Sequence, residues 1–258
     1  MDKNYFIEYY NLERSHWWFK ARAELLDLHI KSIVDFLPPK AELKILNVGA
    51  GTGLTTLILM KYGNVTSVEY DINCCEMVKE KLNLEFHNES ITALPYSDNT
   101  FDLVTSFDVI EHIEDDAKAV DELIRVTKYG GRIVTTVPTF MFLWGQHDLV
   151  NHHYRRYTKE NYSQLWKRSN EIKFHYRTYF NFFLFPVIAG FRLLAKLLPK
   201  KSIRDGAGSD FSVKYISRFN VVPYYIFRAE KFFFRNLIRL PFGVSMLLSV
   251  DKKLHNNM

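Results

Sequence analysis

The sequence is poor in cysteine, with only Cys74 and Cys75 among its 258 residues. Two adjacent cysteines seldom meet the geometry of a disulfide, so we expect both to be free thiols in a reducing compartment. The first twenty residues lack the apolar core of an export signal and the Arg- and Ser-rich pattern of a transit peptide. The sequence therefore favours a protein of the cytoplasm.

Long apolar runs are also scarce. The most apolar stretch, residues 180–198 (FNFFLFPVIAGFRLLAKLL), is interrupted by Arg192 and Lys196. Pro186 suits the first turn of a helix and a second proline follows the stretch, so we expect a helix near 187–198. Twelve residues rise roughly 18 Å, well short of the ~30 Å core of a bilayer. The stretch is therefore not expected to span a membrane.

Negative charge is scarce in one segment only. Residues 180–241 hold eleven Lys and Arg against three acidic residues, a local excess of +8 in a chain of net charge +5, which leaves −3 for the remainder. Many of the aromatic residues, which make up 16% of the chain, lie in this segment. A basic, aromatic surface suits anionic lipid or nucleic acid, and the charge alone does not choose between them.

The first half contains a glycine-rich turn between a strand and a helix. LKILNVGAGTG is a short apolar run that leads into Gly49, Gly51 and Gly53, and a helix-length stretch follows. Alternate glycines let the backbone approach a ligand closely, beside the free N–H groups of a helix start. VTSVEYD is a β-branched strand ending at Glu69, whose carboxylate can accept both hydrogen bonds of a ribose diol.

The following segments continue the alternation. TFDLVTSFDVIEHI and GGRIVTTVP supply two more strands with a helix between them, which predicts a parallel sheet that binds its ligand beyond the carboxyl ends of the strands. A dinucleotide fingerprint would need glycine where the chain has Leu54, and a phosphate-binding Gly-Lys-Ser/Thr loop is missing from the sequence. The spacing therefore disfavours NAD and nucleoside triphosphates.

Four successive motifs resemble those of class I S-adenosylmethionine-dependent methyltransferases. They are ILNVGAGTG, VEYD, ESITALPYSDNTFDLV and FDVIEHI, in the family's order and spacing within residues 42–140. The resemblance implies S-adenosyl-L-methionine as cofactor and an α/β fold, with a Rossmann-like, doubly wound sheet of seven strands that is mostly parallel with an antiparallel last strand. EIKFHYRTYF would be the sixth strand and GVSMLLSVDKK the seventh.

The same resemblance implies roles for individual residues. Gly49, Gly51 and Gly53 would line the methionine part of the cofactor. Glu69 would hold the ribose, and Tyr70 would lie against the adenine. Ser90 and Ile91 would contact the adenine edge, and Phe107 would follow the fourth strand beside the methionine. Asn47 and Ser90 stand where the family commonly has Asp, and both can still form hydrogen bonds, so we expect cofactor binding to survive. A site retained only for its fold is the alternative.

Candidate bases cluster after the fourth and fifth strands. Methyl transfer from a sulfonium is an in-line displacement, so the protein has to align donor and acceptor and, for a weakly acidic hydroxyl, remove a proton. FDVIEHI places Glu111 and His112 after the fourth strand, and WGQHDLVNHHYRRYT adds His147 and His153 after the fifth. We predict that His112, His153 or His147 is the catalytic base. A purely structural role, organising a helix start and a turn, is the alternative.

The pattern around His112 also resembles one found in methyltransferases of small-RNA ends and in ubiquinone-type O-methylation. Those enzymes use an acid-x-x-Glu-His motif with a later His to bind a divalent metal, and the stretch from His153 to Lys159 is similar to the H-x-x-x-x-T-K/R pattern of the small-RNA enzymes. The resemblance implies a metal held by Asp108, Glu111, His112 and His153, although Asp108 stands where those enzymes have Glu. Such a cation would lower the pKa of the acceptor hydroxyl.

Arg155 and Arg156 follow directly. Guanidinium groups suit a phosphate on the substrate, and a solvated face beside Tyr157 is equally consistent with the sequence.

We divide the chain into four parts: an N-terminal helical cap (1–40), the cofactor-binding core (41–179), a helical insertion (180–241) and the last strand with its tail (242–258). The insertion separates the sixth and seventh strands, which the family normally joins by a short connection. In the cap, ERSHWWFKARAELLDLHI predicts a helix with Trp17, Trp18 and Phe19 ahead of it. This helix either covers the cofactor or packs on the core.

The second half of the insertion is expected to be amphipathic. Helical spacing in VPYYIFRAEKFFFRNLIRLP places two sets of residues on opposite faces: Arg228, Lys231, Arg235 and Arg239 on one, and Ile226, Phe233, Leu237 and Leu240 on the other. A basic, aromatic-rich amphipathic helix is typical of a membrane interface. We therefore expect residues 180–241 to contact the membrane surface, with packing as a lid or a dimer interface as the alternative.

The stretches HWWFKAR, HHYRRYT and PFGVSMLLSV further resemble a subgroup of bacterial and archaeal methyltransferases linked to cell-envelope glycan or lipid synthesis. We expect a membrane-peripheral cytoplasmic enzyme that methylates an oxygen, or secondarily a nitrogen, of a lipid-linked or amphipathic acceptor. The alternatives are metal-assisted 2′-O-methylation of RNA, which the apolar helix faces disfavour, and an inactive cofactor-binding partner subunit. The sequence leaves the acceptor and the oligomeric state open.

Overall fold

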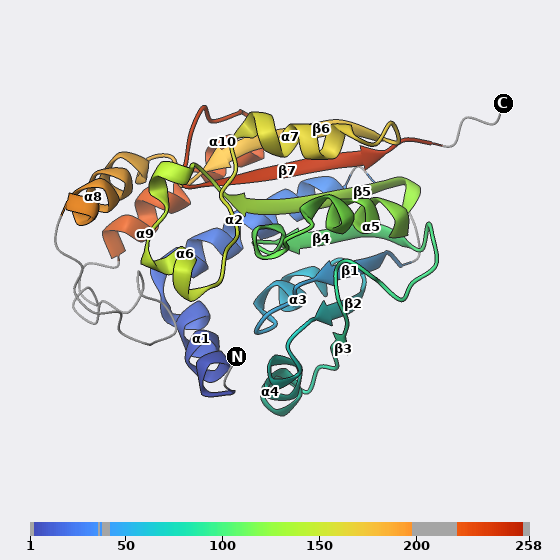
Figure 1. The fold of residues 1–258 in the computed structure, drawn as a ribbon. Helices are drawn as coiled ribbons and strands as arrows, with labels where there is room; N and C mark the ends of the chain where they lie inside the picture. The colour runs from blue at the N-terminus through green and yellow to red at the C-terminus, as the bar shows by residue number, and fades with distance from the viewer. Residues whose placement is uncertain (1–2, 36, 38–41, 198–220, 255–258) are drawn as a thin grey trace.

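A seven-stranded sheet forms the centre of the molecule (Figure 1). The computed structural model describes residues 3–35, 37, 42–197 and 221–254. The strands are β1 (Lys44–Val48), β2 (Asn64–Glu69), β3 (His87–Asn88), β4 (Phe101–Phe107), β5 (Thr127–Pro138), β6 (Ile172–Phe180) and β7 (Ser245–Lys252). Their spatial order is β3-β2-β1-β4-β5-β7-β6, so the order reverses between β1 and β4. Ligands of doubly wound sheets bind at such a reversal.

The directions of the strands determine which edge of the sheet carries most of their carboxyl ends. β1 to β5 pair in parallel, whereas β7 runs antiparallel to both β5 and β6. The carboxyl ends of β1, β4, β5 and β6 therefore lie at the same edge of the sheet. The predicted fold class is confirmed, and the expected sixth and seventh strands correspond to β6 and β7.

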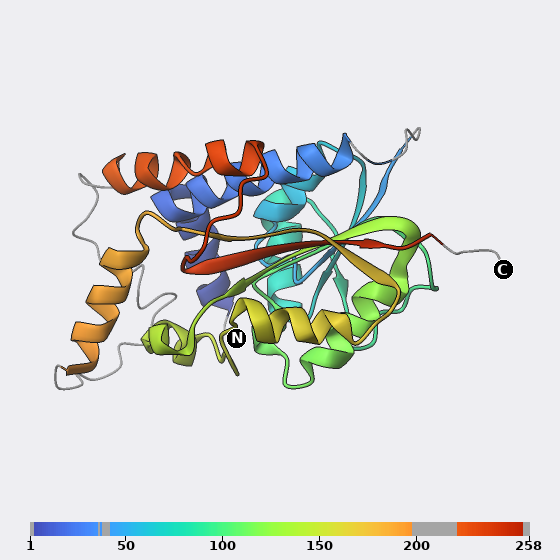
Figure 2. The same cartoon turned by 90° about the horizontal axis from the view of Figure 1, so that it is seen from above.

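Helices cover both faces of the sheet (Figure 2). They are α1 (Lys3–Ser15), α2 (Trp17–Val34), α3 (Leu54–Leu59), α4 (Ile72–Leu82), α5 (Asp116–Val126), α6 (Gln146–Val150), α7 (Lys159–Lys167), α8 (Phe185–Leu197), α9 (Val221–Arg228) and α10 (Lys231–Arg235), with 3₁₀ turns η1 (Ile110–His112) and η2 (Met141–Leu143). Leu25 and Ile30 of α2 pack on Leu247 of β7, and on the opposite face Leu123 of α5 and Trp166 of α7 are buried. Each such side chain stabilises the fold by about 1.5–3 kcal/mol.

The N-terminal region contains two helices, of which the sequence predicted one. α2 begins at Trp17 because the side chain of His16 accepts a hydrogen bond from the backbone N–H of Trp18 at 3.2 Å. The aromatic residues expected ahead of this helix therefore lie within its first turn. α1 precedes it, and Phe6 of α1 packs with Met77 and Val78 of α4.

The insertion follows its prediction only in part. α8 begins at Phe185, close to the expected start, while residues 198–220 lie outside the described residues, so the predicted end of this helix and much of the basic excess stay predictions. The basic stretch that follows was expected to form one helix and instead forms α9 and α10, separated at Ala229 and Glu230. Glu230 is fully buried, and its carboxylate accepts hydrogen bonds from the backbone N–H groups of Asn181 and Phe182, both at 2.7 Å.

The break changes which side chains of this stretch face the core. Phe227 and Phe234 are buried in the cluster that contains α2, whereas Ile226 and Leu237 are exposed. The unbroken helical register that was assumed across residue 230 is therefore wrong, whereas the contact of the apolar side chains with a membrane stays a prediction.

The basic face is used for packing as well. Arg228 and Lys231 each form an ion pair with Glu24 of α2 at 2.8 Å, while Arg235 and Arg239 are exposed as expected. This half of the insertion is thus docked on α2. Within the described residues, every helix falls short of the length and apolarity that crossing a bilayer requires.

Candidate active site

The loop between β1 and α3 has a backbone that favours glycine. Gly49, Gly51 and Gly53 adopt φ values of 70°, 53° and 86°, in the left-handed region. A Cβ atom added to Gly49 would lie 2.2 Å from Cγ2 of Val109, which no side chain tolerates. The loop is held by hydrogen bonds from the N–H groups of Gly49 and Ala50 to a carbonyl of β2 at 2.8 and 2.9 Å. It therefore presents bare backbone at the carboxyl edge of the sheet.

Glu69, at the end of β2, faces this loop as the sequence predicts. Its Oε2 accepts a hydrogen bond from the N–H of Gly51 at 2.9 Å, and its Oε1 accepts one from the N–H of Asp71 at 3.1 Å. Burial raises the pKa of Glu69, while these backbone donors oppose the shift. The carboxylate and the glycines thus share the position at which a ribose and its neighbouring groups would bind.

The residues expected at the adenine differ in exposure. The ring of Tyr70 is 78% exposed and is available for stacking, whereas Ile91 is buried. The hydroxyl of Ser90 lies 2.9 Å from the hydroxyl of Thr92. It also accepts a hydrogen bond from the backbone N–H of Thr92 at 3.3 Å. Ser90 therefore closes its own turn, and the adenine contacts of these residues stay predictions.

Asn47 serves the packing of the loop. It is buried, and its amide donates to the hydroxyls of Thr55 at 2.9 Å and Thr56 at 3.0 Å, while Thr105 donates to its Oδ1 at 3.1 Å. The side chain thus joins β1, α3 and β4. These contacts shape the loop, and the predicted contact of Asn47 with the cofactor stays a prediction.

An arginine of α2 lies at the end of β4, beside the residue expected at the methionine. Arg22 Nη2 donates to Asp108 Oδ2 at 2.6 Å, and its guanidinium carbon lies 6.0 Å from the ring centre of Phe107. Sequence reasoning missed Arg22, because helix and sheet are far apart in the chain. The signal that could have found it is its place in HWWFKAR, the stretch already singled out.

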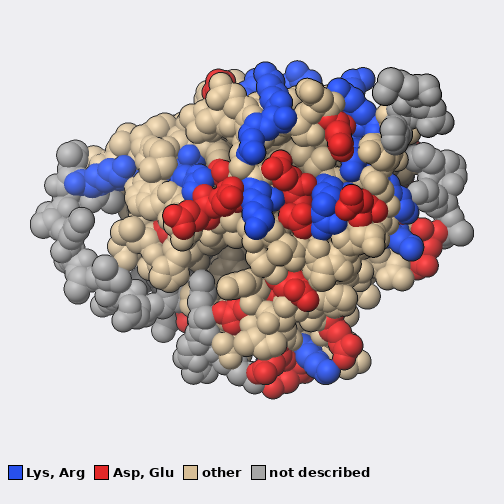
Figure 3. Space-filling view, turned by 45° about the vertical axis from the view of Figure 1, so that its right-hand side comes forward, with Lys and Arg blue, Asp and Glu red and all other residues tan. Residues whose placement is uncertain are grey.

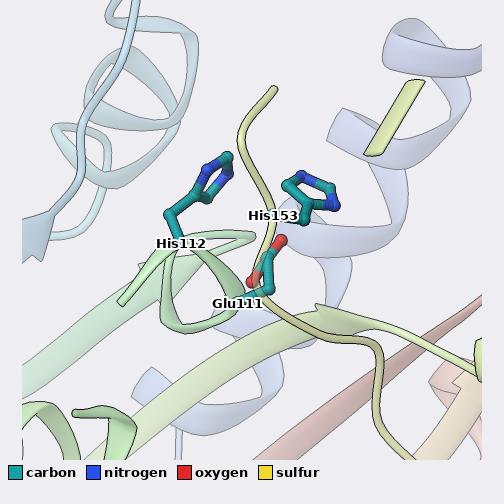
Figure 4. A group of neighbouring side chains, drawn as sticks. All are labelled: Glu111, His112 and His153. Atoms are coloured by element: carbon teal, nitrogen blue, oxygen red, sulfur yellow. The ribbon is translucent and has the colours of Figure 1, made fainter. Parts of the chain in front are cut away.

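The predicted histidines meet beyond the carboxyl ends of β4 and β5. Figure 4 shows Glu111 and His112 on η1 and His153 on a neighbouring segment, with the side chains directed toward one another. The rings of His112 and His153 meet edge to face with centroids 4.5 Å apart, and the ring of His147 lies 5.8 Å from that of His153. The fold therefore brings together all three candidate bases.

Asp148 orients His153, a role that the sequence pattern does not indicate. Its buried carboxylate accepts hydrogen bonds from His153 Nδ1 at 2.8 Å, Arg156 Nε at 2.7 Å and the N–H of Gly145 at 2.8 Å. Burial opposes ionisation, but the hydrogen bond from His153 and the charge of Arg156 hold the pKa of Asp148 well below its usual range. An ionised Asp148 fixes the proton of His153 on Nδ1 and leaves Nε2 as an acceptor.

The rest of the cluster favours neutral groups. Burial, reinforced by the charge of Asp108, raises the pKa of Glu111 well above its usual range. Burial and the neighbouring His153 lower the pKa of His112 to about 4. Among the described residues, neither carboxylate oxygen of Glu111 has a hydrogen-bond partner. Such perturbed pKa values in one cluster are typical of a functional site.

Three of the four residues predicted to hold a metal lie close together, and the metal itself stays a prediction. One ligand atom from each of Glu111, His112 and His153 lies within 4.8 Å of the others, and a cation would satisfy the unpartnered carboxylate. Asp108 does not belong to this group. Its carboxylate is taken by Arg22 and by the hydroxyl of Thr136 at 3.0 Å, so the prediction is wrong at this residue.

The two arginines for which the sequence left a phosphate clamp and a solvated face equally open both contact protein groups. Arg156 is buried against Asp148, and Arg155 pairs with Asp116 at 2.8 Å and donates to the carbonyl of Glu114 at 2.7 Å. Arg156 is buried, so it does not belong to a solvated face, and the phosphate clamp stays a prediction.

Comparisons with known proteins agree with this arrangement. Residues 46–135 match the family model described as a methyltransferase domain. Norajmaline N-methyltransferase of Rauvolfia serpentina is 34% identical over 125 residues, covering 44% of this chain and 42% of that protein. The ubiquinone/menaquinone biosynthesis C-methyltransferase UbiE of Zymomonas mobilis is 37% identical over 106 residues, covering 38% and 44%.

Solved structures share the fold over most of the chain. A geranyl diphosphate methyltransferase in complex with SAM has a TM-score of 0.56 at 13% identity, covering 88% of this chain and 85% of that one. The curated relatives are matched over shorter regions, and the chain spans 38–50% of their length.

Proposed function

We propose that this chain, which carries a class I S-adenosylmethionine-dependent methyltransferase domain, transfers a methyl group from that cofactor to a hydroxyl of an amphipathic acceptor. The observation that carries the proposal is the Asp148–His153 pair at the same sheet edge as the glycine loop and Glu69. When bound, the cofactor supplies an electrophilic methyl group on its sulfonium. Gly49 to Gly53 and Glu69 would hold and orient it.

His153 performs the proton transfer in this proposal. Asp148 keeps the proton of His153 on Nδ1, so Nε2 accepts the proton of the acceptor hydroxyl as the methyl group arrives. The imidazolium that forms is stabilised by the ionised Asp148, which needs no rearrangement during the reaction. His112 is held neutral by burial, so it adds no opposing charge beside His153.

Aromatic side chains beside the cluster support an acceptor with an apolar part. Phe140 stacks on Phe142 and on Tyr179, with ring centroids 5.5 and 5.4 Å apart, and Phe185 meets Phe242 at 5.1 Å. These rings lie at or after the carboxyl ends of β5 and β6 and, for Phe242, just before β7, at the sheet edge where the histidines lie. Such a wall suits an apolar chain or ring, while the reacting hydroxyl meets His153.

The base is tested with isotopically labelled S-adenosylmethionine and a lipid extract of the host as acceptor. His153→Gln should lower label transfer roughly a hundredfold to ten-thousandfold while leaving calorimetric binding of the cofactor unchanged. His175→Gln, on β6 away from the cluster, is the matched control and should transfer at the wild-type rate. Wild-type protein that binds the cofactor and transfers no label to any extract would instead be the inactive partner subunit.

Metal-assisted transfer is the second candidate, favoured by the grouping of Glu111, His112 and His153. A bound cation would lower the pKa of the acceptor hydroxyl, and activity would then disappear in chelator and return with added metal. RNA as acceptor gains no support from the face drawn in Figure 3, where Lys and Arg alternate with Asp and Glu. A nucleic-acid backbone needs a stripe of positive charge.

Helix α8 supports an acceptor delivered from a membrane, because apolar side chains of this helix face outward while its basic side chains contact the protein. Val187, Phe191 and Leu194 form one stripe of the helix at i, i+4 and i+7, and they are 71%, 71% and 63% exposed. Its basic residues face the protein instead: Arg192 donates to the carbonyl of Leu143, and Lys196 donates to a carbonyl of η2 at 2.8 Å. Apolar stripes of this kind mark interaction surfaces.

We infer that an anionic lipid surface covers this stripe. The sequence directly after α8, residues 198–220, contains five Lys and Arg against two Asp, so a net charge of +3 follows the apolar stripe along the chain. Apolar insertion with adjacent positive charge is the combination that binds anionic bilayers. A second copy of the chain carries the same net charge of +5, so electrostatic repulsion disfavours it as the occupant.

Flotation with phosphatidylglycerol vesicles, compared with phosphatidylcholine vesicles, tests the surface. The wild type should float with the anionic vesicles at low salt, and Phe191→Ser should stay at the bottom. Met60→Ser, which removes an exposed apolar side chain just after α3, is the control and should float. Wild-type protein that floats with neither vesicle contradicts the membrane proposal, and a dimer in light scattering that Phe191→Ser dissolves would identify a second copy as the occupant.

A further inference from the structure

A half-buried acid, Glu13, and a buried arginine, Arg22, approach the proposed cofactor loop from the two N-terminal helices. Glu13 of α1 accepts a hydrogen bond from the hydroxyl of Thr52, which lies within the glycine loop. Arg22 of α2 reaches Asp108, directly after β4, and also donates to Thr136 Oγ1 at 3.2 Å. The pair thus spans the two segments, the glycine loop and the end of β4, that meet at the reversal of the strand order.

Arg22 has hydrogen-bonding capacity that the protein leaves unused. Its side chain is 8% exposed, and in the described part of the chain its Nε has no hydrogen-bond partner. A buried guanidinium N–H without an acceptor is costly, and such groups in native proteins usually serve a ligand or an unseen water. The guanidinium fork matches a carboxylate better than any other common anion except phosphate.

Glu13 offers the complementary charge. Its side chain is 14% exposed, and burial raises its pKa although its hydrogen bond to Thr52 opposes the shift. A nearby ammonium would stabilise the ionised carboxylate. Glu13 and Arg22 together therefore suit a zwitterion with one ammonium and one carboxylate.

We infer that Arg22 binds the carboxylate, and Glu13 the ammonium, of the amino-acid end of the cofactor. The inference rests on the proposed function for the identity of the cofactor and adds two residues that none of the four family motifs contains. Asp108 keeps a positioning role, because it holds Arg22 Nη2 and leaves Nε for the ligand.

Two ligands separate this inference from a merely structural role. S-adenosylhomocysteine contains the amino-acid end, and 5′-methylthioadenosine lacks it while keeping the nucleoside. In calorimetry, Arg22→Met should weaken S-adenosylhomocysteine roughly tenfold to a hundredfold and leave 5′-methylthioadenosine within about twofold. Glu13→Gln should show the same selectivity with about a tenfold effect.

Conservative variants cover the case in which Arg22→Met fails to fold. Arg22→Lys keeps the charge and should recover part of the affinity for S-adenosylhomocysteine, and Asp108→Asn should weaken it less than Arg22→Met does. Equal weakening of both ligands by Arg22→Lys and Glu13→Gln would overturn the inference, since it would show that the residues only shape the loop. Wild-type protein that binds neither ligand would refute the proposed function itself.

Discussion

The proposed cofactor side and the proposed acceptor side of this sheet edge are built in different ways. The cofactor side uses backbone: Gly49 to Gly53 and Glu69 are close in sequence, and their contacts are N–H groups and bare Cα atoms. The acceptor side uses side chains that converge from η1, α6 and α8, among them His112, Asp148 and Arg192. Changes of backbone conformation in the loop should therefore damage cofactor binding, as should loss of the proposed Arg22 and Glu13 contacts. Changes of single side chains on the acceptor side should leave cofactor binding intact.

The largest effect is expected where the backbone is most constrained. Gly49→Ala adds a Cβ at a φ of 70°, 2.2 Å from a methyl group of Val109. Strain and overpacking together cost about 3–5 kcal/mol, so affinity for S-adenosylhomocysteine should fall by about a hundredfold or more in calorimetry. Gly190→Ala, in α8, meets no atom within 4 Å and should bind as the wild type does. Equal affinities of the two variants would show that the loop is not the cofactor site.

The acceptor side should respond to the loss of one charge. Asp148→Asn leaves Arg156 buried without its counter-ion, so the free energy of unfolding should fall by about 3 kcal/mol in chemical denaturation. The pKa of Asp148 is lower in the folded state, so its stabilisation of the wild type is present at neutral pH and is lost as the pH falls below about 4. Asp121→Asn, which removes a surface pair with Arg168 at 3.6 Å, is the control and should unfold almost as the wild type does. Cofactor affinity that falls with Asp148→Asn as steeply as with Gly49→Ala would erase the distinction between the two sides.

Glu230, which anchors the start of the insertion, should give the acceptor side a pH dependence. Burial raises its pKa to about 7, although three backbone N–H groups favour the ionised form. A carboxyl group whose pKa is higher in the folded state binds its proton more tightly there. The free energy of unfolding should therefore fall by about 1–3 kcal/mol as the pH rises from the ordinary value near 4.5 to about 7, and Glu230→Gln should remove this slope.

Glu24 provides the comparison for Glu230, since both hold α9 and α10 in place. Burial opposes ionisation of Glu24, but hydrogen bonds from Lys231, Tyr224 and Arg228 lower its pKa to about 2. Its contribution to stability is lost as the pH falls toward 2, so Glu24→Gln should leave the slope between pH 4.5 and 7 intact. Parallel slopes in the wild type and in Glu230→Gln would show that Glu230 is ionised throughout this range.

The smallest effect on stability is expected on the outer face of α8. Phe191 is 71% exposed, so Phe191→Ser should change the free energy of unfolding by no more than about 0.5 kcal/mol in thermal denaturation. Its effect should be confined to vesicle binding. A loss of several kcal/mol would mean that the stripe already packs against this chain and is not a docking surface.

Sequence reasoning reached the cofactor side because its signals are local. Three features lie within thirty residues of sequence: the alternate glycines, the strand ending in Glu69, and Leu54 in place of the glycine that a dinucleotide fingerprint requires. The same reasoning found His112, His147 and His153 by their position after predicted strands, because the carboxyl ends of parallel strands share one edge. It could not predict that Asp108 forms an ion pair with Arg22, because Arg22 belongs to a helix and lies 86 residues away in the chain.

The insertion shows the same limit. Helical periodicity assigned one face to the whole stretch after Val221, whereas the buried Glu230 interrupts the helix and makes Phe227 and Phe234 the packing residues. Periodicity describes a helix in isolation, and a buried contact to the backbone of Asn181 to Phe183 overrides it.

The sequence by itself therefore determined the sheet, its glycine loop and the carboxylate opposite it, because strand alternation and turn conformation are fixed by residues next to one another. Only the tertiary structure decided that Asp148 orients His153, that Arg22 stands at the end of β4, and that α8 turns its arginine inward and its phenylalanine outward. These outcomes depend on which distant groups satisfy a buried charge, and a buried charge takes whichever partner the completed fold places beside it.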